Sequence, residues 1–262
     1  MRTPRLVATD LDGTLVGSDG DVSPRNRDAI RRVEAAGALF VMVTGRPPRW
    51  MAGVSEQTAH RGLAVCANGA LIYHLHTERV VRTHLLEQDA AVTVAAALRS
   101  ALPGIAFAVE RPDASFAHDH SYVPSWEQPD HSPRPVEELV EGGVVKLLAR
   151  HRGMTSDALL AAARTALGDG ATFTHSSNDG LLEVSAVGIS KASGLASLAR
   201  EHGVDAQEVV AFGDMPNDLP MLAWAGHGVA MGNAHPEVLS AADEVTGRND
   251  EDGVAQVLER WF

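Results

Sequence analysis

The sequence is poor in several residue types, and each shortage excludes a class of protein. One cysteine, Cys66, among 262 residues cannot form an internal disulfide, which excludes a secreted disulfide scaffold. Aromatic residues make up 5% and the net charge is −12, so neither nucleic acid nor an anionic membrane surface is an expected partner. No apolar run approaches the roughly 18–20 residues that cross a bilayer, and the N-terminus shows no signal peptide. These shortages predict a cytoplasmic protein.

Short apolar runs alternate with amphipathic segments near both ends of the chain. Leu6–Thr9, Leu39–Val43 and Leu63–Ala67 are continuous and apolar, as expected of strands buried on both faces. The same alternation returns near the C-terminus, with a further strand expected at Val209–Phe212. Strands that alternate with helices in this way predict an α/β fold, a doubly wound parallel sheet of Rossmann-like type.

The middle of the chain follows a different pattern. Asn68-Gly69 is a hairpin signal, and the strand and helix candidates beyond it are mixed in order. Residues 111–135 are rich in Pro, His and Asp and are expected to be loop. We therefore expect a core domain of residues 1–84 and 187–262, with an inserted α+β cap domain at residues 85–186. Gly188 is a plausible hinge between them.

The strongest motif is Asp10-Leu11-Asp12-Gly13-Thr14, directly after the first expected strand. Ligands of open parallel sheets bind beyond the carboxyl ends of the strands, which is where this motif lies. Side chains of extended backbone alternate in direction, so Asp10 and Asp12 leave the strand on the same side. Two carboxylates held together repel unless a cation or a shared proton lies between them. The alternative, a solvated Asp-Gly turn, is common but does not explain the pair.

A second acidic motif, Gly213-Asp214-Met215-Pro216-Asn217-Asp218, follows the strand expected at Val209–Phe212. Acids or amides at three of its positions suit a hard cation such as Mg²⁺, which prefers oxygen ligands. Helix capping is the alternative for these residues taken alone. Together with Asp10 and Asp12, they predict a metal site.

Two further features point to phosphate. Thr44-Gly45-Arg46 ends the strand Leu39–Val43, where a hydroxyl and a turn of backbone N–H groups could hold a phosphoryl oxygen. The chain has 22 basic residues but only two lysines, so Lys191, at the start of an expected core helix, suggests a site that needs a compact point charge. For Lys146 we expect a structural role.

These positions resemble the haloacid dehalogenase superfamily of phosphotransferases, and specifically its Cof-type branch, subclass IIB. The four motifs of that family correspond to Asp10–Leu15, Val43–Arg46, Lys191 and Gly213–Asp218. The segment Val229–Ala234 also looks like the ending of Cof-type chains. The motifs cover the core. For the insertion, the resemblance rests only on its position in the chain and on its length.

The resemblance implies a Mg²⁺-dependent phosphatase that acts on a small phosphorylated metabolite, such as a sugar phosphate, through an aspartyl-phosphate. Asp10 would be the nucleophile and Asp12 the general acid and base. The implied metal residues are Asp10, Asp12 (through its backbone carbonyl), Asp214 and Asp218. The implied substrate-binding residues are Thr44, Gly45, Arg46, Lys191 and Asn217.

Other functions remain open at this point. A phosphomutase would share Asp10 and Asp12, and a non-catalytic phosphate- or metal-binding regulator, or a receiver phosphorylated on aspartate, could share the fold. Zinc at His118, His120 and His131 is not favoured, because no Cys or Glu lies at ligand spacing. The substrate and the choice between monomer and homodimer are not resolved by the sequence.

Overall fold

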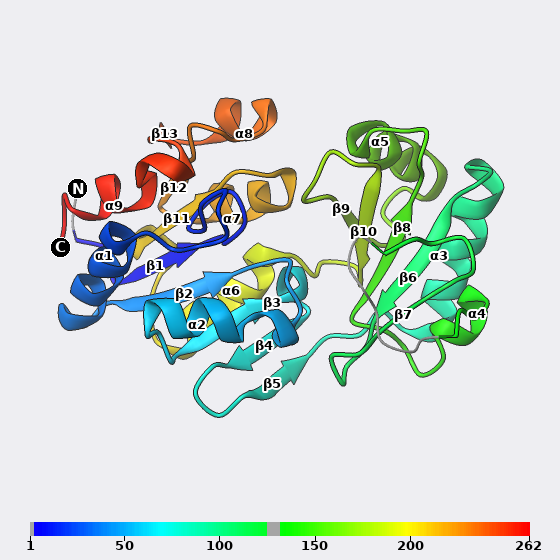
Figure 1. Ribbon diagram of the computed structural model, residues 1–262, viewed down its shortest axis with the longest axis horizontal. Coiled ribbons are helices and arrows are strands. Elements are labelled where there is room, and N and C mark those ends of the chain that lie inside the picture. The colour runs from blue at the N-terminus through cyan, green and yellow to red at the C-terminus, as the bar shows by residue number, and fades with distance from the viewer. Residues whose placement is uncertain (1–2, 125–131) are drawn as a thin grey trace. The chain divides into compact units, whose positions relative to one another are not determined.

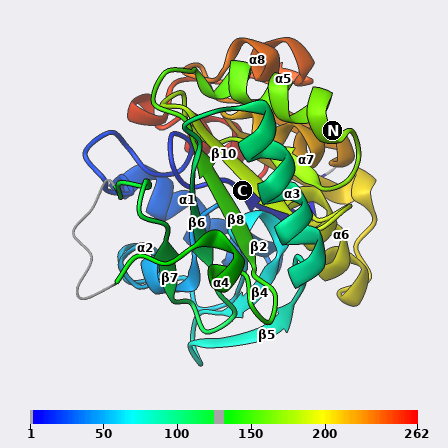
Figure 2. The same cartoon turned by 90° about the vertical axis from the view of Figure 1, so that its right-hand side faces the viewer.

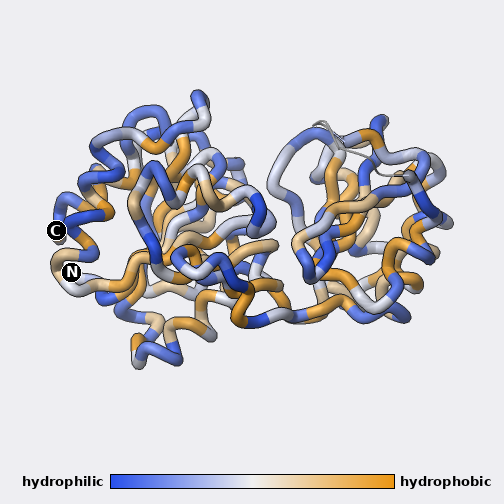
Figure 3. Tube along the Cα trace, turned by 60° about the horizontal axis from the view of Figure 1, so that its bottom comes forward, coloured by the Kyte–Doolittle hydropathy of each residue, from blue (hydrophilic) through white to orange (hydrophobic). Residues whose placement is uncertain are grey.

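The computed structural model describes residues 3–124 and 132–262. The chain forms two compact units, one made of Met1–Arg82 with Ser190–Phe262 and the other of Thr83–Ile189 (Figure 1). The first unit is thus assembled from both ends of the chain, and the second is continuous. Hydrophobic segments run through the interior of each unit (Figure 3).

The first unit contains an eight-stranded sheet with the order β13-β12-β11-β1-β2-β3-β4-β5. Strand β1 pairs in parallel with both β2 and β11, and β3 pairs antiparallel with β4. All four residues of β1 are buried, which explains its unbroken apolar sequence. The strands are β1 (Leu6–Thr9), β2 (Leu39–Val43), β3 (Leu63–Cys66), β4 (Leu71–His74), β5 (Arg79–Thr83), β11 (Val209–Gly213), β12 (His227–Ala230) and β13 (Glu244–Val245).

The first unit also contains helices, and capping residues determine where the two longest of them begin. Ser23 caps the first helix by accepting a hydrogen bond from the Asn26 backbone, with Pro24 at the first helical position. Ser190 and Ser193 form a capping box that fixes Lys191 as the first residue of another helix. The helices are α1 (Pro24–Ala35), α2 (Ala52–Thr58), α6 (Lys191–Glu201), α7 (Leu219–Trp224), α8 (Pro236–Ala241) and α9 (Gly253–Leu258).

The second unit contains a five-stranded sheet with the order β7-β6-β8-β10-β9, antiparallel in every pair. Helices cover one of its faces (Figure 2), where Phe107, Leu147 and Leu182 are fully buried. The other face carries a smaller apolar cluster that includes Phe116 and Tyr122. The elements are α3 (Gln88–Ala101), β6 (Ala106–Glu110), β7 (Phe116–His118), α4 (Val136–Leu139), β8 (Lys146–Arg150), α5 (Ser156–Leu167), β9 (Thr172–Thr174) and β10 (Leu181–Ser185).

The predicted α/β fold class is confirmed, one local prediction is wrong, and one short strand was not predicted. Part of the stretch expected to be loop, residues 111–135, forms strand β7, which pairs with β6 through three residues. The short edge strand β13 was not expected, because Glu244–Val245 is too short to show a period. No helix in the described part of the chain is long and apolar enough to cross a membrane.

Candidate active site

The motifs singled out in the sequence meet at one edge of the first unit's sheet. Asp10 follows β1, Thr44 follows β2, and Asp214 follows β11. These three strands are neighbours and run in parallel, so their carboxyl ends lie side by side. The fold therefore brings together residues that are up to 204 positions apart in the chain.

Lys191 lies between two carboxylates. Its Nζ atom is 2.6 Å from Asp10 Oδ1 and 2.6 Å from Asp218 Oδ1, and both contacts are buried. Burial disfavours the ammonium charge, but the contacts with Asp10 and Asp218 outweigh it and raise the pKa of Lys191 above its usual value. Lys191 is therefore a fixed positive charge beside the carboxylate that the sequence predicts as nucleophile.

Three buried carboxylates gather around this lysine. Asp10, Asp214 and Asp218 each offer one oxygen, and these oxygens lie within 4.8 Å of one another. Burial raises the pKa of Asp10 well above its usual range, and burial together with the charge of Asp218 raises the pKa of Asp214 to about 7. The predicted metal residues Asp10, Asp214 and Asp218 are thus brought together by their side chains.

This group fits a divalent cation. Burial and the neighbouring charges, which raise the pKa values of Asp10 and Asp214, disfavour the ionisation of all three carboxylates at once. Ionised together beside one ammonium, they would leave two negative charges for a divalent cation to compensate. Carboxylate oxygens are the donors that hard cations such as Mg²⁺ take. Both the net negative charge of the ionised group and its oxygen donors therefore fit a divalent metal ion.

The backbone at Asp12-Gly13-Thr14 is shaped to let Asp214 approach. Gly13 has φ +79°, and a Cβ atom there would lie 2.3 Å from Asp214 Oδ2. Thr14 Oγ1 donates to Asp214 Oδ1 at 3.0 Å. Gly13 is thus required both by its backbone conformation and by the space that Asp214 takes.

Asp12 and Arg46 form an ion pair in this structure. Arg46 Nε and a terminal nitrogen donate to the two oxygens of Asp12 at 2.8 and 2.5 Å. The Asp12 side chain is 61% exposed, and its carboxylate is not part of the three-carboxylate group. The turn Thr44-Gly45-Arg46, which carries Arg46, is fixed because Thr44 Oγ1 accepts a hydrogen bond from the Arg46 backbone N–H at 3.0 Å.

Asn217 contacts Asn68, a residue that was expected only to form a hairpin turn. Asn217 Nδ2 donates to Asn68 Oδ1 at 3.1 Å, and Asn217 Oδ1 is buried without a partner among the described residues. Asn68 is buried and has φ +56°, in the turn that joins β3 to β4. Its Asn-Gly dipeptide indicated only a hairpin, yet the turn carries an amide to the site.

Asn233 was also missed as a site residue, although its segment resembled the ending of Cof-type chains. Its Nδ2 donates to the Gly13 carbonyl at 2.8 Å, and its Oδ1 accepts from the Asn249 backbone at 2.9 Å. Asn249 in turn donates to the Val16 carbonyl at 3.0 Å. The C-terminal segment therefore holds the loop that follows Asp10.

The histidines considered for zinc do not form a cluster in the described residues. His118 Nδ1 lies 2.8 Å from the Asp119 carbonyl oxygen, and His131 lies outside the described residues. Within those residues, Asp10, Asp214 and Asp218 are the group of side chains that could hold an ion.

Comparisons with known proteins agree with this geometry. A family profile described as haloacid dehalogenase-like hydrolase matches residues 7–258. The chain is 29% identical to 5-amino-6-(5-phospho-D-ribitylamino)uracil phosphatase YcsE of Bacillus subtilis, over 98% of this chain and 95% of that protein. It is 30% identical to YitU of the same organism, which carries the same activity name, over 99% of this chain and 98% of that protein.

Solved structures give the same result. BT1666 of Bacteroides thetaiotaomicron, from a study of phosphatases of this superfamily, has a TM-score of 0.82 and 26% identity, covering 99% of this chain and 95% of its own. A haloacid dehalogenase-like hydrolase from the same organism has a TM-score of 0.76 and 27% identity, covering 99% and 100%. The resemblance inferred from the motifs is confirmed: the chain belongs to the haloacid dehalogenase-like hydrolases and is an enzyme of their phosphatase type.

Proposed function

We propose that the chain is a Mg²⁺-dependent phosphatase that hydrolyses a small phosphorylated metabolite through an aspartyl-phosphate on Asp10. The observation that carries this proposal is the position of Lys191, whose ammonium contacts Asp10 and Asp218 at 2.6 Å each. A cation fixed beside a buried carboxylate suits an anionic phosphoryl group that approaches the same carboxylate. Phosphoryl transfer needs positioning and charge neutralisation above all.

The reaction has two steps. In the first, an Asp10 oxygen forms a bond to phosphorus while the bond from phosphorus to the ester oxygen breaks, and Asp12 gives its proton to that oxygen. In the second, Asp12 takes a proton from water, which attacks phosphorus and breaks the bond to Asp10. The products are the alcohol and inorganic phosphate, and both aspartates return to their starting states.

The proposal requires Asp12 to change partners. In this structure both oxygens of its carboxylate accept hydrogen bonds from Arg46, so neither is directed at the ester oxygen of a substrate. Because the Asp12 side chain is exposed, it can turn away from Arg46 when a substrate enters. The released guanidinium of Arg46 is then available to the phosphoryl group, two oxygens of which can accept hydrogen bonds from it.

The remaining residues hold the phosphoryl group and the metal. Asp10, Asp214 and Asp218 would supply carboxylate oxygens to the metal. The Asp12 backbone carbonyl, which the resemblance implies as a ligand, would be a further oxygen. When bound, Mg²⁺ would neutralise charge on the phosphoryl oxygens and orient them. Thr44, Gly45, Lys191 and Asn217 would bind the phosphoryl oxygens themselves.

We further propose that the second unit is the cap that selects the leaving group, within the residues 85–186 that the sequence predicts. Both Bacillus subtilis relatives are named for a phosphorylated ribitylaminouracil, which supports a substrate that is a phosphomonoester of a polyol or sugar. The chain's own charge of −12 makes the local cations Lys191 and Arg46 important for attracting such an anion.

The test is hydrolysis of p-nitrophenyl phosphate, followed by release of both p-nitrophenol and free phosphate. Activity should be lost in excess EDTA and restored when Mg²⁺ is added beyond the chelator. Full activity in excess EDTA would contradict the metal assignment. Transfer of phosphate to an added sugar phosphate, without free phosphate, would indicate a phosphomutase instead.

A further inference from the structure

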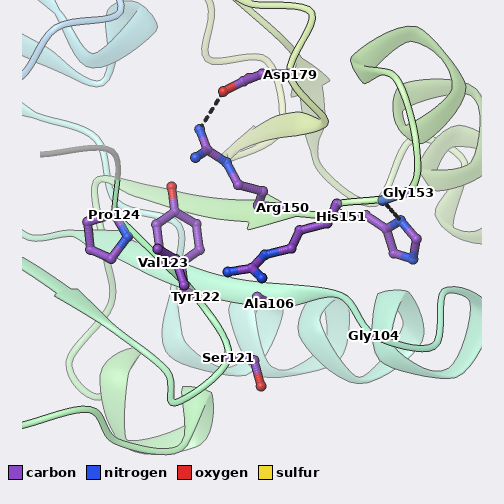
Figure 4. A pocket seen from close by; sticks show the side chains of 11 residues that line it. Gly104, Ala106, Ser121, Tyr122, Val123, Pro124, Arg150, His151, Gly153 and Asp179 are labelled. Carbon is purple, nitrogen blue, oxygen red and sulfur yellow. Dashed lines mark hydrogen bonds and ion pairs between the residues drawn. The ribbon is translucent and has the colours of Figure 1, made fainter.

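Two buried side-chain atoms that have no hydrogen-bond partner among the described residues lie in candidate ligand sites. One is Arg150 Nε, in a pocket of about 460 Å³ in the second unit, where the guanidinium pairs with Asp179 and lies beside Tyr122 (Figure 4). That pocket belongs to the unit proposed above to select the leaving group. The other atom is Asn217 Oδ1, in the candidate active site. Buried polar atoms are nearly always paired, so this oxygen needs an explanation.

The explanation lies at the other end of the same amide. Asn217 Nδ2 donates to Asn68 Oδ1 at 3.1 Å, and this is the one hydrogen bond of the Asn217 side chain within the described residues. Both side chains are buried. An amide presents donors on its nitrogen and an acceptor on its oxygen, so the contact with Asn68 decides which of the two faces which way. Because no described residue donates to Oδ1, Asn68 alone sets the orientation of the Asn217 amide.

Asn68 lies in a turn with an unusual backbone. Ala67, Asn68 and Gly69 have φ values of +50°, +56° and +99°, three left-handed residues in succession. Residues with a side chain rarely adopt this region, and the surrounding structure must hold a residue such as Ala67 there. Strained backbone of this kind is concentrated at functional sites. The segments that pack against the turn therefore indicate what it serves.

The first of these segments follows β2. The Asn68 backbone N–H donates to the Thr44 carbonyl at 3.0 Å, and the Ala67 N–H donates to the Arg46 carbonyl at 3.0 Å. These two hydrogen bonds tie the turn to both ends of Thr44-Gly45-Arg46. Both donors are backbone groups, so a substitution of Asn68 by a residue other than proline leaves them in place.

The second segment is the start of α6. A Cβ atom on Gly69 would lie 2.0 Å from the Ser190 carbonyl oxygen, and one on Gly194 would lie 3.0 Å from Gly69 Cα. The two glycines therefore allow the turn to pack against the helix whose first residue is Lys191. The turn thus contacts two segments that are proposed to bind the phosphoryl group, and the Asn68 side chain reaches a third.

We propose that Asn68 is a positioning residue, which holds the Asn217 amide in the orientation that donates to the phosphoryl group. Asn217 Nδ2 carries two hydrogens: one goes to Asn68 Oδ1, and the other is left for a phosphoryl oxygen. An amide released from Asn68 can turn over and present Oδ1 in place of Nδ2, and this acceptor cannot bind a phosphoryl oxygen, which is an acceptor too. This inference deepens the proposed function and rests on it, because it takes Asn217 as a ligand of the phosphoryl group.

The test measures the factor by which Asn217→Ala lowers kcat/KM for p-nitrophenyl phosphate, in four backgrounds. In the otherwise wild-type chain we expect a factor of about 10 to 100, the contribution of one hydrogen bond to a charged group. With Asn68→Gly the factor should be about three- to tenfold smaller, because the amide is then no longer held before the substrate arrives. Glycine suits φ +56°, so this substitution removes the Asn68 amide and keeps the turn.

Two backgrounds serve as controls. Asn68→Asp keeps an acceptor oxygen and tolerates the left-handed region, so the factor should equal that of the wild type to within about twofold. The added charge lowers kcat/KM with either residue at position 217 and therefore cancels in the factor. Glu78→Gly replaces an exposed residue that also has a left-handed backbone, with φ +53°, in the turn between β4 and β5. It should leave the factor unchanged.

Binding of inorganic phosphate in Mg²⁺, measured by calorimetry, gives the same comparison without turnover. A merely structural role of Asn68 would lower the melting temperature of Asn68→Gly and leave the factor unchanged, and this result overturns the proposal. A factor that falls as much in Asn68→Asp or in Glu78→Gly overturns it as well. A factor below about two for Asn217→Ala alone refutes Asn217 as a phosphoryl ligand, and with it the role of Asn68. If the wild type hydrolyses no p-nitrophenyl phosphate, the proposed function fails, while phosphate binding still decides the role of Asn68.

Discussion

Replacing Lys191 with methionine removes the ammonium between Asp10 and Asp218 and keeps most of the side-chain volume. The two carboxylates then remain buried with the third, Asp214, without the charge that both contacted at 2.6 Å. Removing one partner of a buried ion pair costs about 3–5 kcal/mol. For a unit of this size each kcal/mol lowers Tm by about 2–4 °C, so we expect a fall of roughly 6–20 °C in EDTA.

Mg²⁺ should reverse part of this loss. With all three carboxylates ionised, the net charge of the three carboxylates and residue 191 is −3 without the lysine and −2 with it. The variant should therefore bind a divalent cation more tightly than the wild type. The Tm increase on adding Mg²⁺ should therefore be larger in Lys191→Met than in the wild type. Activity should still fall about 10²–10³-fold, the usual loss for one charge-stabilising group.

Lys146 provides a matched control for this experiment. It is the other lysine of the chain, and its Nζ lies 2.6 Å from Glu183 Oε1 in an equally buried pair of the second unit. Lys146→Met should also lose stability, but its Mg²⁺-induced change in Tm should equal that of the wild type. Calorimetry with EDTA and with Mg²⁺ measures both variants. A Tm loss below about 2 °C for Lys191→Met, or an unchanged Mg²⁺ effect, would refute the reasoning.

Three further substitutions test the site. Asp10→Asn should abolish phosphate release without lowering Tm in EDTA, since it removes one of three like charges; residual turnover near the wild-type rate would reject Asp10 as nucleophile. Gly13→Ala should raise the Mg²⁺ concentration for half-maximal activity at least tenfold, because the new Cβ meets Asp214 Oδ2; an unchanged Mg²⁺ titration would contradict this. Asn233→Ala should cost about 1–3 kcal/mol, measured by urea unfolding, because the Gly13 carbonyl loses its donor; a loss below about 0.5 kcal/mol would mean that water replaces the amide.

The sequence predicted the centre of the site because parallel strands leave little freedom there. Once Leu6–Thr9 and Val209–Gly213 are neighbouring parallel strands, the residues directly after them must lie at one edge. Asp10 and Asp214 follow from this placement without knowledge of any side-chain conformation. The rarity of lysine and a place at the start of an expected helix indicated that Lys191 serves a site, but its burial, and the capping box of Ser190 and Ser193 that fixes this start, came from the structure.

The contacts that escaped prediction depend on side-chain direction and on distant loops. The Asp12 carboxylate turns toward Arg46, which no spacing in the sequence indicates. Asn233 reaches Gly13 across 220 residues of chain, and Asn68 reaches Asn217 across 149. The pairing order of the second unit's sheet was likewise not predictable, because short antiparallel strands carry no signal of which strand lies beside which. Strand β7 lies in a stretch whose composition is that of a loop.

The assembly of the first unit from both ends of the chain has a consequence for synthesis on the ribosome. Strand β1 lies in the middle of its sheet and pairs with β11. The hydrogen bonds of β1 on that side, where Leu6 lies opposite Val209, therefore form only after β11 has been made. The second unit is continuous and has all its strands once Ile189 has been made. At about 5–20 residues per second, the 29 residues from Ser190 to Asp218 take roughly 1.5–6 s. Until Asp218 has been made, β1 lacks its neighbour β11, and Asp10 is present without the two other carboxylates of the site; the order of translation thus keeps the site incomplete until both parts of the first unit have been made.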